Sequence, residues 1–258
     1  MPPIRTEAIV LRSIPYRETS VLLDLFTQKL GRTRCVLKGV RVSPSRVAPA
    51  AFATGAHIDV VLYASRASAL ALAHAPRVIS LCEPGGARLA AWHTLLHLVS
   101  TFTPDREPMP ELFALLRDAP RALSAGQHPA AILFGIKLRF VRIMGYGVHL
   151  VGCTACGTRA GCVFFSGRRG GVLCVSCGRQ EKSAVRTSAR VVTLMRHFDG
   201  LSYDGLARIR HVPPALLREG NLLVNAVLQY HTDVPSQWWV HESNLFPAGG
   251  TGSRDAGG

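Results

Sequence analysis

The chain has 258 residues and 48% hydrophobic content, which is enough for two folded domains, each with its own core. Its formal net charge of +14, carried mostly by arginine, favours polyanionic partners, although an arginine-rich genome would also raise the charge. The sequence shows neither a signal peptide nor an apolar run of about 18 residues, so we expect a cytoplasmic protein without a membrane span.

Residues 1–80 predict five short strands separated by turns. The first three are TEAIVLRSI, TSVLLDLFT and KLGRTRCVLKG, and they are followed by HIDVVLY and ALALAHA. Five strands in one block of this length predict a small barrel or a sandwich.

The third predicted strand carries a basic face. Arg32, Arg34 and Lys38 share one parity of the strand, so their side chains project from the same side. The exposed loop that follows adds Arg41 and Arg46. Each of these side chains alone would be interpreted as a solvated surface charge, but together they predict a track for phosphates.

From residue 81 the apolar spacing becomes helical. The segments before the cysteines are LCEPGGARLAAWHTLLHLVSTF, PELFALLRDAPRAL and PAAILFGIKLRFVRIMGYG, and those after them are SARVVTLMRHFDG and PPALLREGNLLVNAVLQYHT. We therefore expect one helical domain made of residues 81–149 and 179–246, with an insert at 150–178. The glycine-rich tail, residues 247–258, is predicted to be disordered.

Four cysteines in the insert form two C-x-x-C pairs separated by seventeen residues: Cys153 with Cys156, and Cys174 with Cys177. This spacing is typical of a four-cysteine zinc site. Four thiolates would complete the tetrahedral shell and leave no position for a catalytic water. The sequence therefore predicts one structural zinc ion.

Two further residues of this region are weaker candidates for metal ligands. Cys162 lacks a C-x-x-C partner and is expected to be a bystander, and His149 is expected to be a surface residue. A thiol-disulfide exchange role is disfavoured because such a motif usually stands singly beside a βαβ pattern.

Sequence motifs for common enzyme classes are missing. There is no phosphate-binding loop of the Walker type, no G-x-S-x-G elbow and no H-E-x-x-H pair. Acidic residues are few and scattered, so the sequence predicts a protein that is not an enzyme.

The segment YRETSVLLDLFTQKLGRTRCVLKGVR resembles the N-terminal signature of the RecO family of bacterial recombination and repair mediators. The order of a barrel, helices and a four-cysteine motif is also similar, over roughly residues 4 to 240. The resemblance implies an α+β multidomain protein whose residues 1–80 form an OB-fold. It also places Lys38, Gly39 and Arg41 in a basic region that touches DNA.

The same resemblance implies partners and a mechanism. The implied partners are single- and double-stranded DNA, RecR and single-stranded DNA-binding protein. The implied mechanism is annealing of complementary strands and, together with these proteins, loading of a recombinase. The expected location is the cytoplasm, at the nucleoid. An apolar groove flanked by Lys137, Arg139 and Arg142 is the expected docking site for single-stranded DNA-binding protein, although those residues also fit a solvated helix face. Arg168 and Arg169 are expected to add a second DNA contact.

Two alternatives stay open from the residues alone. One is a zinc-stapled adaptor whose positive surface recruits proteins and contacts nucleic acid only incidentally. The other is an RNA-binding zinc-ribbon protein. The salt dependence of DNA binding distinguishes the first of these, because direct phosphate contacts make affinity fall steeply with salt.

Overall fold

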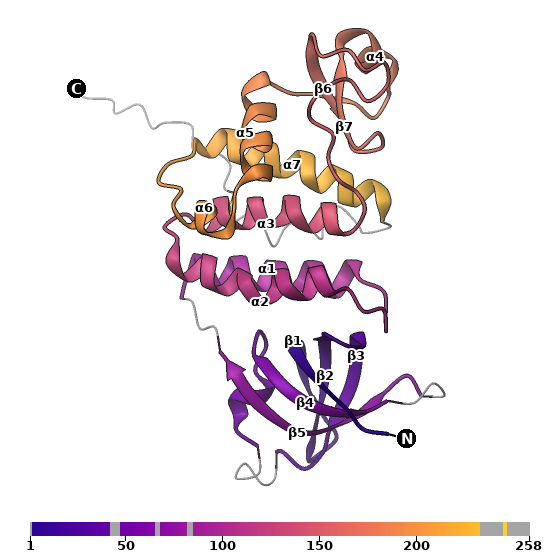
Figure 1. Ribbon diagram of the computed structural model, residues 1–258, viewed down its shortest axis with the longest axis vertical. Coiled ribbons are helices and arrows are strands. Elements are labelled where there is room, and N and C mark those ends of the chain that lie inside the picture. Colours follow the sequence, from indigo (N-terminus) through magenta and orange to yellow (C-terminus); the bar gives the residue numbers. More distant parts are fainter. Residues whose placement is uncertain (1, 42–46, 65–67, 82–84, 233–244, 247–258) are drawn as a thin grey trace, which may run out of the picture. The chain divides into compact units, whose positions relative to one another are not determined.

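The computed structural model describes residues 2–41, 47–64, 68–81, 85–232 and 245–246 (Figure 1). The chain divides into two compact units, Met1–Ser124 and Ala125–Gly258. The first unit contains the strands of a barrel and most of two helices. The second contains further helices and a small three-stranded sheet.

Five strands of the first unit close into a barrel in the order β1-β2-β3-β5-β4. They are β1 (Ile4–Tyr16), β2 (Ser20–Thr27), β3 (Gly31–Leu37), β4 (His57–Tyr63) and β5 (Ala71–Ser80). Neighbouring strands are antiparallel except β3 and β5, which run parallel. The predicted OB-like barrel is confirmed.

Alternating side chains explain why these segments form strands around one core. On β2, Val21, Leu23 and Leu25 point inward and are at most 4% exposed, whereas Leu22 and Asp24 between them are only partly buried. The same period of two recurs on β3, where Cys35 is fully buried and Arg34 is exposed. This alternation decides which charged residues reach the outer surface of the barrel.

Helices α1 (Ala87–Phe102) and α2 (Pro110–Ala125) follow the barrel, and the segment between them lies against the start of β3. The Arg106 amide donates a hydrogen bond to the Arg32 carbonyl at 2.8 Å. Gly31 has a φ of +65°, and a Cβ atom there would lie 1.9 Å from the Glu107 carbonyl oxygen. Only glycine allows the two backbones to approach this closely.

The second unit is built around α3 (Pro129–Ile143), which contacts α5 (Ala189–Gly200), α6 (Tyr203–Ala207) and α7 (Pro214–His231). Every residue of α3 from Ala131 to Leu138 is buried, so the helix has no solvated face along this stretch. One of these residues is Lys137, whose Nζ atom donates to Asn221 Oδ1 at 2.8 Å and to Asn225 Oδ1 at 2.5 Å. The ammonium group of this buried lysine is thus held by side chains of α7.

Helices α1 and α2 lie in the same compact unit as the barrel, except for the last residue of α2. The expected domain boundary at residue 80 stays a prediction. Whether residues 81–149 and 179–246 act as one domain stays a prediction. The expected tail, residues 247–258, lies outside the described residues. In the described part of the chain, no helix is both long enough and apolar enough to span a bilayer.

We predict that Gly31→Ala lowers the free energy of unfolding of the protein by about 2 kcal/mol or more. The left-handed conformation already costs a residue with a side chain about 1–2 kcal/mol. The added methyl group would also collide with the Glu107 backbone. Gly39→Ala is the matched control, since Gly39 has a φ of +75° but, among the described residues beyond its chain neighbours, no heavy atom lies within 4 Å of the position that a Cβ would take. Urea denaturation measures both variants. Equal losses of stability would contradict a close approach at Gly31.

Candidate metal centre and nucleic-acid interface

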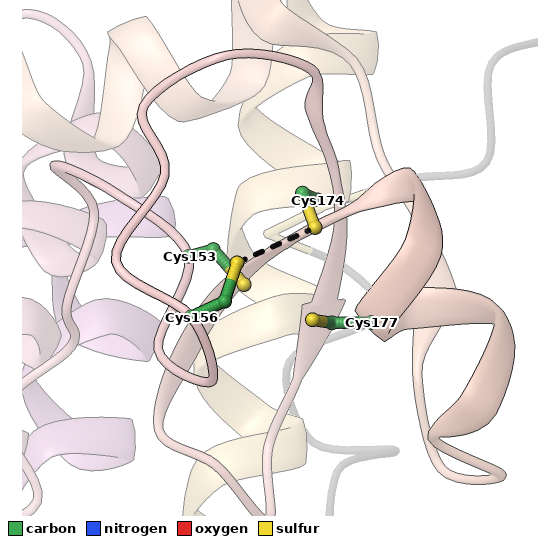
Figure 2. A group of neighbouring side chains, drawn as sticks. All are labelled: Cys153, Cys156, Cys174 and Cys177. Atoms are coloured by element: carbon green, nitrogen blue, oxygen red, sulfur yellow. Dashed lines mark hydrogen bonds between the residues drawn. The ribbon is translucent and has the colours of Figure 1, made fainter.

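The four cysteines of the two C-x-x-C pairs come from two separate turns of the second unit (Figure 2). Cys153 and Cys156 lie in the loop after α3. Cys174 ends strand β7 (Gly171–Cys174) and caps the short helix α4 (Val175–Gln180), which carries Cys177. Strand β7 pairs with β6 (Cys162–Ser166), and β6 also pairs with β8 (Val185–Arg186).

The thiol sulfurs of Cys153, Cys156, Cys174 and Cys177 all lie within 4.8 Å of one another. The Cys156 and Cys174 sulfurs are 3.8 Å apart, a separation far too long for a disulfide bond of about 2.05 Å. A tetrahedral ion with metal–sulfur bonds of about 2.3 Å requires sulfur–sulfur separations of about 3.8 Å. The four residues therefore fit a metal ion.

The pKa values of Cys153 and Cys177 in this cluster are shifted in opposite directions. Burial raises the pKa of Cys153, but hydrogen bonds from the backbone of Cys174, Cys156 and Ala155 outweigh it and lower the pKa to about 6. Hydrogen bonds with the Cys174 and Cys156 thiols raise the pKa of Cys177 to about 12. Binding of a metal ion to these residues as thiolates would release the protons that the thiols carry.

Neither Cys162 nor His149 belongs to the four-thiol group. The Cys162 thiol donates to the Thr158 carbonyl at 3.5 Å, and its pKa is raised, chiefly by burial. The backbone of His149 pairs with the strand that leads to Cys174, through bonds to Gly170 and Val172, while its side chain is exposed. Both residues therefore lie beside the cluster.

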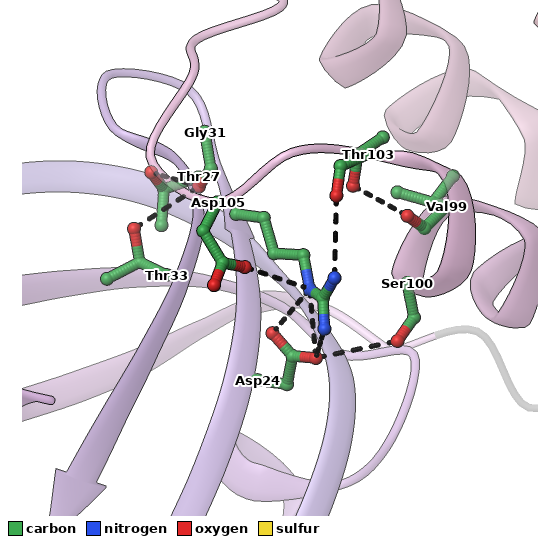
Figure 3. Close-up of polar contacts among 9 residues, drawn as sticks. Asp24, Thr27, Gly31, Thr33, Val99, Ser100, Thr103 and Asp105 are labelled. Atoms are coloured by element: carbon green, nitrogen blue, oxygen red, sulfur yellow. Dashed lines mark hydrogen bonds and ion pairs between the residues drawn. The ribbon is translucent and has the colours of Figure 1, made fainter. Parts of the chain in front are cut away.

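Arg32 lies on the predicted face of β3 but is held by neighbouring groups, of which Figure 3 labels Asp24, Asp105 and Thr103. Its guanidinium contacts Asp24 at 3.1 Å, Asp105 at 3.7 Å and the Thr103 carbonyl at 3.4 Å, and 15% of the side chain is exposed. We correct the expectation that Arg32 is a free cation on the phosphate track. Two carboxylates neutralise its charge, and it joins β3 to the segment after α1.

Arg34 and Lys38 are exposed, as the strand parity predicts. Arg12 on β1 was not predicted as part of this surface, because the pairing of strands distant in sequence was unknown. In the barrel, Arg12 is opposite Asp24 on β2, and Asp24 is opposite Arg34 on β3. Across the ranges that the structure describes, neither Arg12 nor Arg34 forms an ion pair with an acidic side chain.

A cavity of about 310 Å³ lies at this row of charges and is lined by Arg12, Asp24, Arg32, Arg34 and Ser100 among others. Ser100 belongs to α1, so the cavity is bordered by the barrel and by that helix. The arrangement offers exposed guanidinium groups on two sides of a neutralised pair. Such a surface can hold the phosphate oxygens of a polyanion.

The other predicted DNA contacts are distributed over both units. Arg41 is exposed and donates to the Arg17 carbonyl at 2.8 Å, whereas Arg46 lies outside the described residues. In the second unit, Arg168 and Arg169 lie 3.9 Å and 3.4 Å from Glu181. Hydrogen bonds from Ser183 and the neighbouring arginines lower the pKa of Glu181, so its negative charge offsets part of theirs.

The predicted partner-binding residues on α3 do not share one surface. Lys137 has 0% exposure, so we correct the expectation that it contacts a partner protein. Arg139 is half-buried over the Tyr203 ring and donates to the Leu201 carbonyl. Only Arg142 is exposed, and it pairs with Asp199. The packing of α5, α6 and α7 around α3 explains why these three side chains differ.

We predict that Lys137→Met lowers the free energy of unfolding by about 1–3 kcal/mol, because Asn221 and Asn225 lose a buried donor. Arg142→Met is the control, since an exposed ion pair contributes about 0–1 kcal/mol. Chemical denaturation measures the difference. A Lys137→Met protein of unchanged stability that binds a partner more weakly would contradict the buried placement.

We predict that Cys174→Ser abolishes binding of a thiolate-coordinated metal ion, whereas Cys162→Ser retains about one ion per chain. Cobalt substitution provides the measurement, because tetrahedral cobalt with thiolate ligands absorbs in the visible and near-ultraviolet range. The expected loss of thermal stability in Cys174→Ser follows from the coupling between metal binding and folding. Equal cobalt spectra for the two variants would exclude Cys174 as a ligand.

Comparisons with known proteins agree with the order of these parts. Residues 1–79 match the family described as "Recombination protein O N terminal", and residues 85–237 match "Recombination protein O C terminal". A protein of Frankia casuarinae named DNA repair protein RecO is 31% identical over 246 residues, covering 90% of this chain and 95% of the relative. Proteins of the same name from Geobacter metallireducens and Streptomyces griseus are each 30% identical, covering 90% and 89% of this chain and 94% of each relative. The chain belongs to the RecO family of DNA repair proteins.

Proposed function

We propose that the protein is a non-catalytic recombination mediator that binds single- and double-stranded DNA and anneals complementary strands. With RecR, it would help to load a recombinase onto DNA that is coated by single-stranded DNA-binding protein. Membership of the RecO family supports the general role in DNA repair and recombination. We place this activity in the cytoplasm, at the nucleoid.

The observation that carries the proposal is the row of Arg12, Asp24 and Arg34 on three adjacent strands. Because neighbouring strands are about 4.8 Å apart, the two arginines are separated by about 10 Å across the barrel surface. Asp24 forms hydrogen bonds with Arg32, so its charge is not available to neutralise Arg12 or Arg34. Lys38 and Arg41 continue the positive charge beyond the end of β3.

Annealing follows from charge neutralisation. Two complementary strands repel each other through their phosphates, and cations on a protein surface lower that repulsion while releasing counterions. The contacts proposed here are to the backbone, so the bases stay accessible for pairing. No bond is made or broken by the protein in this mechanism.

Zinc is the metal ion that we propose for the four thiols, because a closed tetrahedral set of four cysteines is typical of structural zinc. The ion would hold the loop of Cys153 and Cys156 against β7 and α4. Arg168 and Arg169, between the two pairs, would then be held at a constant position as a second DNA contact. Arg139 and Arg142 remain candidates for a contact with single-stranded DNA-binding protein.

The test compares wild-type protein with three charge reversals: Arg12→Glu, Arg34→Glu and Lys38→Glu. Each should weaken single-stranded DNA binding by about tenfold or more at low salt, and each lost phosphate contact should reduce the slope of log affinity against log salt by about 0.7. The rate of strand annealing should fall in parallel. Arg190→Glu, at an exposed position at the start of α5, is the charge-matched control.

Two results would contradict the proposal. A shallow salt slope for the wild-type protein, unchanged by the three substitutions, would favour the adaptor alternative. Tighter binding of RNA than of DNA of the same sequence would favour an RNA-binding protein instead.

A further inference from the structure

A second cavity of the first unit, with a volume of about 320 Å³, lies away from the row of Arg12 and Arg34. Residues of the barrel, including Ile9, Gly55 and His57, line one side, and Trp92, Arg117 and Arg121 of α1 and α2 line the other. Its volume is at the lower end of the range of about 300–1,000 Å³ found for small-molecule sites. Its size therefore suits a small ligand.

Trp92 supplies a buried polar group at this cavity. The side chain is 0% exposed, and its indole Nε1–H finds no acceptor in the described part of the chain. A Cβ atom on Gly55 would lie 2.3 Å from Nε1, so only glycine allows the backbone to approach the polar edge of the indole this closely. Buried donors in native proteins are nearly always paired, so an acceptor that enters the cavity would satisfy this group.

Helix α2 adds an acceptor at the same place. Pro120 lies inside the helix and has no N–H to donate to the Leu116 carbonyl. Leu116 and Pro120 both line the cavity. The walls thus combine an unpaired donor with a carbonyl that lacks its usual helical partner, and Ile9 and Leu81 provide apolar surface around them.

Positive charge is present in the same lining. Arg117 and Arg121 are four residues apart, and so share one face of α2. Both are exposed, and Arg117 also contacts Asp118 at 2.9 Å. His57 is held by Glu7 at 2.9 Å on the barrel side. Exposed guanidinium groups beside a buried donor favour a ligand with an anionic end and a polar, largely flat body.

We propose that this cavity binds one unstacked nucleotide of single-stranded DNA, with the base beside the Trp92 indole N–H and the phosphate at Arg117 and Arg121. The inference rests on the proposed function as a DNA-binding protein and adds a site to it. A nucleotide carries a flat apolar face, a polar edge and a phosphate, which are the three features that the lining can accommodate. A simple anion would leave the apolar surface of Ile9 and Leu81 without a partner.

Nuclear magnetic resonance of the ¹⁵N-labelled protein tests the proposal directly. The chain has three tryptophans, and the indole resonance that disappears in Trp92→Phe identifies Trp92. Thymidine 5′-monophosphate should shift this resonance downfield, as expected when a free N–H gains an acceptor. Thymidine and inorganic phosphate should each bind about tenfold more weakly or worse, because each lacks one of the two contacts.

Substitutions at α2 provide a second readout that does not depend on Trp92. Arg117→Gln with Arg121→Gln should weaken binding of thymidine 5′-monophosphate by about tenfold or more and leave thymidine binding unchanged. Arg190→Gln is the control for loss of one exposed charge. Thermal melting of each variant shows that it is folded. If Trp92→Phe does not fold, nucleotide binding by the α2 variants still tests the proposal.

An unshifted Trp92 resonance at millimolar nucleotide would overturn the proposal. Inorganic phosphate that binds as tightly as the nucleotide would also overturn it, by showing a simple anion site. Single-stranded DNA binding and its salt slope, measured on the same preparations, separate this failure from failure of the proposed function. If the cavity does not bind the nucleotide but the protein binds single-stranded DNA normally, only the proposed nucleotide site is rejected.

Discussion

The contact of Arg32 with Asp24 and Asp105 is the interaction on which the first unit depends. It joins a barrel strand to the segment after α1, in a place where both Arg32 and Asp24 side chains are mostly buried. Removing either partner would leave a charge of the opposite sign partly desolvated, which is more costly than the loss of an exposed pair. The close approach at Gly31 acts at the same junction and requires the same packing.

The two cavities described above lie between the barrel and its helices. Helix α1 contributes Ser100 to one cavity and Trp92 to the other, so each exists only where the helix lies against the barrel. The cavity at Arg12 and Arg34 presents guanidinium groups that suit backbone phosphates. The other combines a buried indole with charged residues of α2, which suits a single nucleotide. The two proposals therefore use different sets of residues in one structural unit.

The four thiols have an equivalent role in the small sheet of the second unit. The buried cluster around the cysteines contains Cys153, Leu173 and Cys174 with a few partly buried neighbours, and Phe165 and Val172 of the same sheet are buried outside it. The apolar surface around the cysteines is small, and a bound metal ion would add folding free energy on this side of the sheet. The cysteine motif thus fits a structural role.

The sequence by itself determined the barrel strands, the long helices and the grouping of the four cysteines, because periodicity and spacing are local properties. Short elements such as α4 and α6 carried too few residues to show a period. Only the tertiary structure decided which cations are available. Asp24 and Asp105 neutralise Arg32, Asn221 and Asn225 hold the buried Lys137, and strand register brings Arg12 beside Arg34. The state of a charged side chain depends on neighbours that are distant in sequence, and no local pattern records them.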